Sequence, residues 1–155
     1  RYKCLAIRQS LGKEYDRVLD WDELFSKARD TYKEGFSDMV PFWDLEFTDG
    51  DDQPRDSSSA SIAACGMLEM IKSMDKEDAA IYDNYARQLI KSVYENYAVI
   101  DADKSNGLVL HSTYSNHSPY NTCNHYGVDE CNSWGDYFYM EALHRMLDPE
   151  WELYW

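Results

Sequence analysis

Apolar residues recur at intervals of three and four along residues 77–98, which is the most regular stretch of the chain. The stripe consists of Ile81, Tyr82, Tyr85, Ala86, Leu89, Ile90, Val93, Tyr94 and Tyr97. A different face of the same helical projection carries charged residues, namely Asp83, Arg87, Lys91 and Glu95. This separation is typical of an amphipathic helix with one buried and one solvated side. We therefore predict an outer helix over residues 77–98.

A second helix is predicted over residues 60–70, and its composition is different. Most of its residues are small, which lets neighbouring backbones approach closely, so we expect an inner helix surrounded by protein. It contains Cys65, which we expect to be buried. Asp56 or the serines at 57–59 can cap its first turn by accepting hydrogen bonds from free amide groups.

Three further segments are predicted as helices: residues 1–10, closed by Gly12; residues 20–34, with Asp20 as the cap and Gly35 as the stop; and residues 133–147, ended by Pro149. Long polar connections at 36–55 and 101–132 interrupt the helical pattern. No run has the strand period, so the predicted class is all-α. Alternating inner and outer helices indicate a toroid of helical hairpins, although about five helices cannot close such a ring.

The charge balance narrows the possible partners. Lys and Arg total 15 against 29 Asp and Glu, which gives a net charge of −14. Because phosphate contacts need basic clusters, this argues against nucleic acid or an anionic membrane as a partner.

No apolar stretch is long enough to span a bilayer, and no signal-peptide pattern opens the chain. The four cysteines form no Cys-x-x-Cys pair. We expect a cytoplasmic protein with reduced thiols.

Aromatic residues make up 15% of the chain, and many stand beside Asp, Asn or Gly in the predicted loops. Flat rings with hydrogen-bonding neighbours suit sugar rings, which have an apolar face and a rim of hydroxyl groups. The alternative is ordinary core and interface packing. Trp43 and Trp134 are accordingly interpreted either as stacking platforms at a cleft edge or as plugs at the end of the helical barrel.

Four strings in order carry a family resemblance: residues 42–50, residues 53–58, residues 127–130 with 134–143, and residues 151–155. Together they resemble the C-terminal part of unsaturated glucuronyl hydrolases, family 88 of the glycoside hydrolases. The resemblance implies an (α/α)6 barrel, of which residues 1–155 would form a single segment supplying the closing hairpins. The remaining barrel helices of the same protein would be its partner.

The resemblance also implies a substrate and a reaction. The substrate is an oligosaccharide left by a lyase, such as a chondroitin- or hyaluronan-type disaccharide, with an unsaturated uronic acid at its non-reducing end. The family hydrates that double bond, with an aspartate as general acid and base. The family's catalytic aspartates lie in earlier helices without a counterpart here. We therefore expect no catalytic residue in this segment, and neither a cofactor nor a metal.

Residues 114–118 resemble a family loop whose two serines and following lysine recognise the sugar beyond the scissile bond. Ser115 and Ser118 match the serines, so the resemblance implies that both bind substrate. The lysine has no match, because residues 119–126 form a longer insertion without Lys. Without that cation, we expect a weaker preference for a sulfated sugar.

Several charged or metal-ligating residues allow two interpretations. Arg55 can steer an anionic sugar, or Arg55 and Asp56 can form a cap and ion pair that fix the loop before the inner helix. Asp129 and Glu130 can supply a general acid or cap the last helix. One group of zinc-type ligands occurs, but its spacing matches no standard zinc site: His111, His117, Cys123, His125 and Cys131.

A different class of function remains open alongside the hydrolase. Half a toroid leaves the inner faces of its helices uncovered, and uncovered apolar patches tend to bind partners. The alternative is a non-catalytic helical module that binds an acidic glycan or a protein.

Overall fold

The computed structural model describes residues 38–44, 46–48, 50–117, 127–148 and 150–152. The chain divides into two compact units, residues 1–37 and residues 38–155. The helices predicted over residues 1–10 and 20–34 lie outside the described residues, and so does Pro149.

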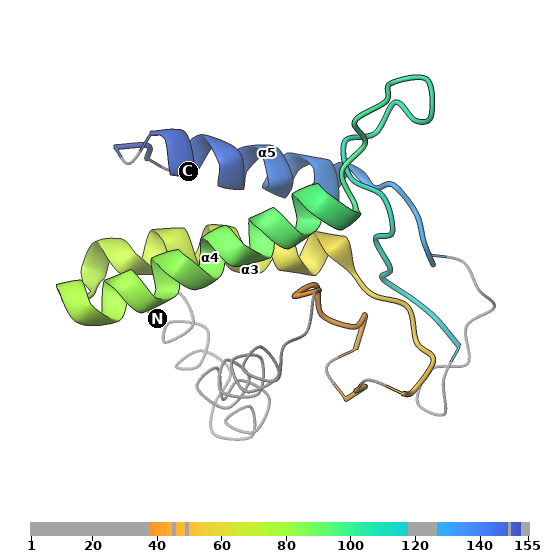
Figure 1. The fold of residues 1–155 in the computed structure, drawn as a ribbon, viewed down its shortest axis with the longest axis horizontal. Coiled ribbons are helices and arrows are strands. Elements are labelled where there is room, and N and C mark those ends of the chain that lie inside the picture. Colours follow the sequence, from red (N-terminus) through yellow and green to blue (C-terminus); the bar gives the residue numbers. More distant parts are fainter. Residues whose placement is uncertain (1–37, 45, 49, 118–126, 149, 153–155) are drawn as a thin grey trace, which may run out of the picture. The chain divides into compact units, whose positions relative to one another are not determined.

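The second unit contains the helices α3 (Ser57–Met70), α4 (Lys76–Asn96) and α5 (Ser133–Leu147), and the short 3-10 helix η2 (Ile71–Ser73) joins α3 to α4. In Figure 1, α4 runs back along α3, and α3 and α5 start at the same end of the unit. Helix α3 packs against both α4 and α5, which contact each other much less. Within the described residues there are isolated β-bridges but no strands, which confirms the all-α class.

Helix α3 is the inner helix that its small residues predict. The side chain of Asp56 caps it by accepting from the backbone N–H groups of Ser58 (3.1 Å) and Ser59 (3.2 Å). Ala60 and Ala64 are completely buried, and Cys65 is buried as expected. Because these side chains are small, α4 and α5 can both pack closely on α3.

Helix α4 confirms the amphipathic prediction in its second half and corrects it in two respects. It ends at Asn96 instead of residue 98, because Ala98 leaves the helix to form a bridge with Val109. Ala86, Leu89, Ile90 and Val93 are buried, but Ile81 and Tyr94 are 48% and 54% exposed. The predicted stripe is wider than the surface that α3, its main described neighbour, can cover.

Helix α5 has the predicted bounds, but its cap is not the predicted one. Asn132 caps it, because its Oδ1 accepts from the backbone N–H of Gly135 at 2.7 Å, and the acid in the first turn is Asp136. The interpretation of Asp129 and Glu130 as the cap is therefore wrong. Both residues precede the cap position, and Glu130 instead forms a bridge with Ser112.

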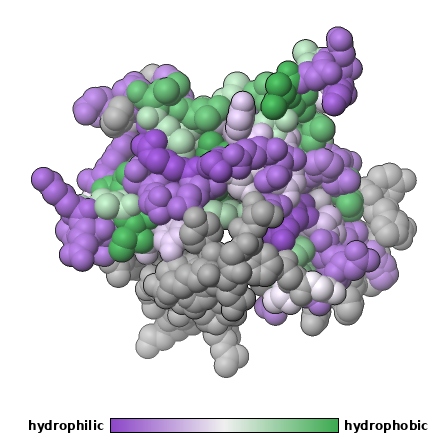
Figure 2. All heavy atoms as spheres, viewed as in Figure 1, coloured by the Kyte–Doolittle hydropathy of each residue, from purple (hydrophilic) through white to green (hydrophobic). Residues whose placement is uncertain are grey.

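The long connections contain no helix in their described parts, as predicted. Phe42 forms an antiparallel bridge with Arg55 in the first connection, and Ser112 forms one with Glu130 in the second. Apolar side chains remain exposed along α5, where Figure 2 shows green patches on the side of the unit where this helix runs. None of the helices described is both long and apolar enough to cross a membrane.

Candidate functional site

The predicted binding residues that the structure describes belong to one end of the unit, where α3 and α5 begin and the two long connections meet (Figure 1). Trp43 and Arg55 come from the first connection, Ser115 from the second, and Trp134 from the first turn of α5. Ser118 lies outside the described residues.

Trp43 is linked to the connection that carries Ser115. Its ring N–H donates to Oε1 of Gln53 at 2.9 Å, and the same oxygen accepts from Nδ2 of Asn116 at 3.1 Å. The ring also packs against Phe47, with centroids 5.8 Å apart. Trp43 is half-buried. Gln53 and Asn116 carry no periodic signal, so sequence reasoning missed this link.

Trp134 belongs to an exposed aromatic pair next to Ser115. It is 40% exposed, and its ring N–H donates to Oγ of Ser58 at 3.3 Å. Its ring meets the exposed ring of Tyr114 edge to face, with centroids 5.4 Å apart. Gly127 has a φ of +92°, and a Cβ there would lie 2.6 Å from the Tyr114 ring, so only glycine permits this approach. The negative charge of Glu130 raises the pKa of Tyr114.

Arg55 is bound within its own connection. Its Nη1 donates to the carbonyl of Val40 at 2.6 Å, and its Nε lies 3.8 Å from Oδ2 of Asp38. The guanidinium also lies 4.2 Å from the centre of the Phe42 ring. The predicted loop-fixing ion pair therefore exists, but with Asp38 and not with Asp56.

Asp56 acts as a structural acceptor at the centre of this end. Besides the two backbone bonds that cap α3, its Oδ1 accepts from Oγ of Ser58 at 2.7 Å and from the backbone N–H of Thr113 at 3.2 Å. Its carboxylate is thus surrounded by donors, which indicates a structural role for Asp56. It joins the start of α3 to the second connection.

Ser115 lies at one end of a pair of hydrogen-bonded segments, residues 112–115 and 127–130, which we call the ribbon. Ser112 and Glu130 exchange two backbone hydrogen bonds of 2.8 and 2.9 Å, and the N–H groups of Tyr114 and Ser115 donate to the carbonyl of Gly127 at 2.9 and 3.4 Å. These hydrogen bonds therefore fix the position of the backbone around Ser115.

The zinc-type ligands do not come together in the part of the chain that the structure describes. There, no three His, Cys, Asp or Glu side chains group as a metal site would require. His111 lies against Asp129, with Nδ1 and Oδ1 2.6 Å apart. Desolvation, and then the charge of Asp136, raise the pKa of the Cys131 thiol. Cys123 and His125 lie outside the described residues.

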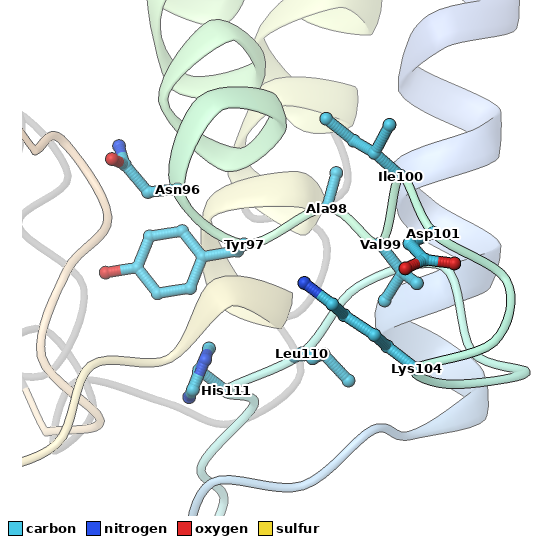
Figure 3. A pocket seen from close by; sticks show the side chains of 9 residues that line it. All are labelled: Asn96, Tyr97, Ala98, Val99, Ile100, Asp101, Lys104, Leu110 and His111. Carbon is cyan, nitrogen blue, oxygen red and sulfur yellow. The ribbon is translucent and has the colours of Figure 1, made fainter.

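Two hollows lie away from the predicted binding residues. One, of about 300 Å³, is at the end of α4, and Figure 3 shows Tyr97, Lys104 and His111 around it. The hydroxyl of Tyr97 donates to Asp38, and burial followed by this bond raises its pKa. The other hollow, of about 350 Å³, is lined by residues of α5 and by Trp151.

Comparison with known proteins supplies the family. No family model matches the chain. It is 44% identical over 120 residues to an unsaturated chondroitin disaccharide hydrolase of Streptococcus pneumoniae, covering 76% of this chain and 28% of that protein. It is 30% identical over 111 residues to an unsaturated glucuronyl hydrolase of Bacillus sp. strain GL1, covering 70% of this chain and again 28% of the relative.

Solved structures agree with the sequence relatives. A variant of the Streptococcus agalactiae unsaturated glucuronyl hydrolase, complexed with dGlcA-GalNAc6S, matches with a TM-score of 0.67 and 36% identity, covering 92% of this chain and 37% of that one. These neighbours are α/α toroids, so the expected part of a toroid is confirmed. The chain spans 28% of the length of the first curated relatives. Over the region that it shares with them, this chain belongs to the unsaturated glucuronyl hydrolases.

Proposed function

We propose that residues 1–155 are one segment of an unsaturated glucuronyl hydrolase, forming the C-terminal wall of its toroid and its outer sugar-binding loop. The whole enzyme removes an unsaturated uronic acid from lyase-generated glycosaminoglycan oligosaccharides, with chondroitin- or hyaluronan-type disaccharides as substrates. The observation that carries this proposal is the 44% identity to a relative named unsaturated chondroitin disaccharide hydrolase. We place the protein in the cytoplasm.

The predicted binding residues have distinct tasks at the shared end of α3 and α5. The exposed ring of Trp134, with Tyr114 at its edge, offers an apolar platform to a sugar ring. Ser115 and Ser118 offer hydroxyl groups that can bond to sugar hydroxyls. Trp43 adds a half-open ring, and Arg55 adds a positive charge that attracts the uronate carboxylate.

Catalysis in this proposal comes from the remaining barrel helices of the same protein, which contain the family's aspartates. They cover the exposed apolar side chains of α5, namely Tyr137, Met140, Leu143 and Leu147. Such a row of exposed apolar residues on one helix is typical of an unfilled interface. A positioned aspartate then transfers the protons needed to add water across the double bond, without a cofactor.

Two samples test the proposal: the natural gene product isolated from its own cells, and the 155-residue chain. We expect a gene product of larger mass that consumes unsaturated chondroitin disaccharide, measured by loss of the double-bond absorbance. We expect the 155-residue chain to bind the disaccharide without turnover. A gene product of the same size as this chain that binds sugar without turnover would instead identify the non-catalytic glycan-binding module. Turnover by the 155-residue chain would contradict the proposal that catalysis lies upstream.

The missing lysine in residues 119–126 leads to a second test. Since the sequence over residues 114–126 contains no Lys or Arg, 6-sulfated and unsulfated disaccharides should bind with dissociation constants within about threefold of each other. A sulfated sugar that binds far more tightly would show that another cation replaces the lysine.

A further inference from the structure

Two side chains outside the proposed sugar contacts meet in an unusual backbone setting. His111 and Asp129 both have left-handed backbone conformations, with φ values of +61° and +62°. Nδ1 of His111 and Oδ1 of Asp129 lie 2.6 Å apart. Non-glycine residues adopt this conformation at a cost, which persists only where the surrounding structure imposes it. Among the described residues, three that are not glycine have a positive φ, and two of these three are the partners of this one contact.

His111 and Asp129 each make further contacts with neighbouring segments. The carbonyl of His111 accepts from the N–H of Ser57 (3.3 Å), the first residue of α3, and its ring meets the Tyr97 ring edge to face with centroids 5.7 Å apart. The N–H of Asp129 donates to Oγ1 of Thr113 at 3.2 Å. The contact therefore connects both segments of the ribbon to the start of α3.

The position of the His111–Asp129 contact indicates that it orients the ribbon. It lies at the base of the ribbon, directly beside the Ser112–Glu130 bridge, and Ser115 follows three residues after that bridge. Both side chains are exposed. Because exposed ion pairs contribute little to the stability of a protein, overall stability does not account for the two strained conformations. Holding the ribbon in one orientation does account for them.

We propose that His111 and Asp129 form a clasp that positions the sugar-binding segment around Ser115. They are positioning residues, because they act through the ribbon and not on the sugar. This inference rests on the proposed function, since it assigns the ribbon to sugar binding.

Three variants of the 155-residue chain test the clasp. Asp129→Gly removes the carboxylate, and glycine adopts a positive φ without strain. A loss of binding in this variant would therefore come from the missing carboxylate and not from backbone strain. Asp129→Asn keeps an accepting oxygen and also tolerates this conformation. Glu95→Gln is the matched control, since it removes a carboxylate from the exposed Lys91–Glu95 pair on α4, where nitrogen and oxygen are 2.9 Å apart. The measurements are the dissociation constant for unsaturated chondroitin disaccharide, amide hydrogen exchange and the melting temperature.

We expect Asp129→Gly to raise the dissociation constant about tenfold, which corresponds to about 1.4 kcal/mol. Amide exchange should accelerate in residues 112–115 and 127–130 and stay unchanged in the helices, with the melting temperature retained. Asp129→Asn should restore most of the affinity, and Glu95→Gln should have no effect.

Two results overturn the inference in distinguishable ways. If the wild-type chain binds and Asp129→Gly binds equally well, the clasp is wrong and the proposed function stands. If the wild-type chain does not bind the disaccharide, the proposed function fails first and the positioning role fails with it.

Discussion

The two ends of α5 differ in how far their side chains are buried and in what those side chains contact. In its second half, Arg145 is 5% exposed and donates to Glu141 at 2.8 Å and to Glu69 of α3 at 2.6 Å. Its guanidinium also lies 4.1 Å from the centre of the Trp151 ring. At the start of the helix, Trp134 is open to solvent beside the Ser115 ribbon.

The difference separates residues that hold the unit together from those that are free to bind. A buried guanidinium needs its acidic partners, because water no longer solvates it, so the Arg145 cluster is committed to packing α5 on α3. An exposed ring with its N–H already bonded can receive a sugar without losing a partner. The same helix therefore has a structural end and a proposed binding end.

The largest effect is expected at the structural end. Arg145→Ala removes the ion-pair partner of the buried Glu141 carboxylate, and should lower the free energy of unfolding by about 3–5 kcal/mol. Arg87→Ala is the control, because it breaks the exposed Arg87–Asp83 pair of 2.9 Å and should cost less than about 1 kcal/mol. Urea unfolding measures both values. Equal losses in the two variants would remove the distinction between buried and exposed pairs.

The next effect is expected at the anchor between α3 and the second connection. Asp56→Ala removes the cap of α3 and the bond to Thr113, and should lower the free energy of unfolding by about 2 kcal/mol. Asp75→Ala removes a cap of the same type from α4, but an exposed one that bonds only Glu77 and Asp78, and should cost about 1 kcal/mol. Thermal or urea unfolding provides the comparison. A loss no greater for Asp56 than for Asp75 would show that the link to Thr113 adds nothing.

At the binding end, two aromatic residues of α5 form a matched pair. Trp134 and Tyr137 are both 40% exposed, but only Trp134 lies beside the Ser115 ribbon. Trp134→Ala should raise the dissociation constant for unsaturated chondroitin disaccharide about tenfold, whereas Tyr137→Ala should leave it unchanged. Titration calorimetry measures both constants. Equal weakening would point to general destabilisation of α5 instead of a lost sugar contact.

The last prediction concerns the dependence of stability on pH. Burial, reinforced by the charge of Glu141, raises the pKa of Cys65 from 9.0 to about 12. The unfolded chain therefore loses this proton at lower pH than the folded chain, so stability falls as the pH rises from 9 towards 12. We expect Cys65→Ala to lose stability less steeply than wild type over this range, as measured by urea unfolding at several pH values. Parallel pH profiles would show that the thiol does not titrate differently in the two states.

Local patterns were sufficient for much of the fold. Small residues over 60–70 predicted the buried α3, although this helix begins earlier, at Ser57. Asp56 was one of the two predicted caps of α3, and the bounds of α5 agree with the prediction. These features depend on helical spacing and on capping groups next to the helix they cap, which are properties of neighbouring residues. The four ordered strings also predicted the family that the comparisons then supplied.

The site depended on contacts between distant parts of the chain. Nothing local indicated that Arg55 pairs with Asp38, that Gln53 bonds both Trp43 and Asn116, or that Asp56 accepts from Thr113. The interpretation of Asp129 and Glu130 as the cap of α5 was wrong, because Asn132 caps this helix and Asp129 contacts His111. The sequence by itself therefore determined the helices α3, α4 and α5, the cap of α3 and the family resemblance. Only the tertiary structure decided which loop side chains meet, because hydrogen bonds and ion pairs across the fold leave no periodic signal in the chain.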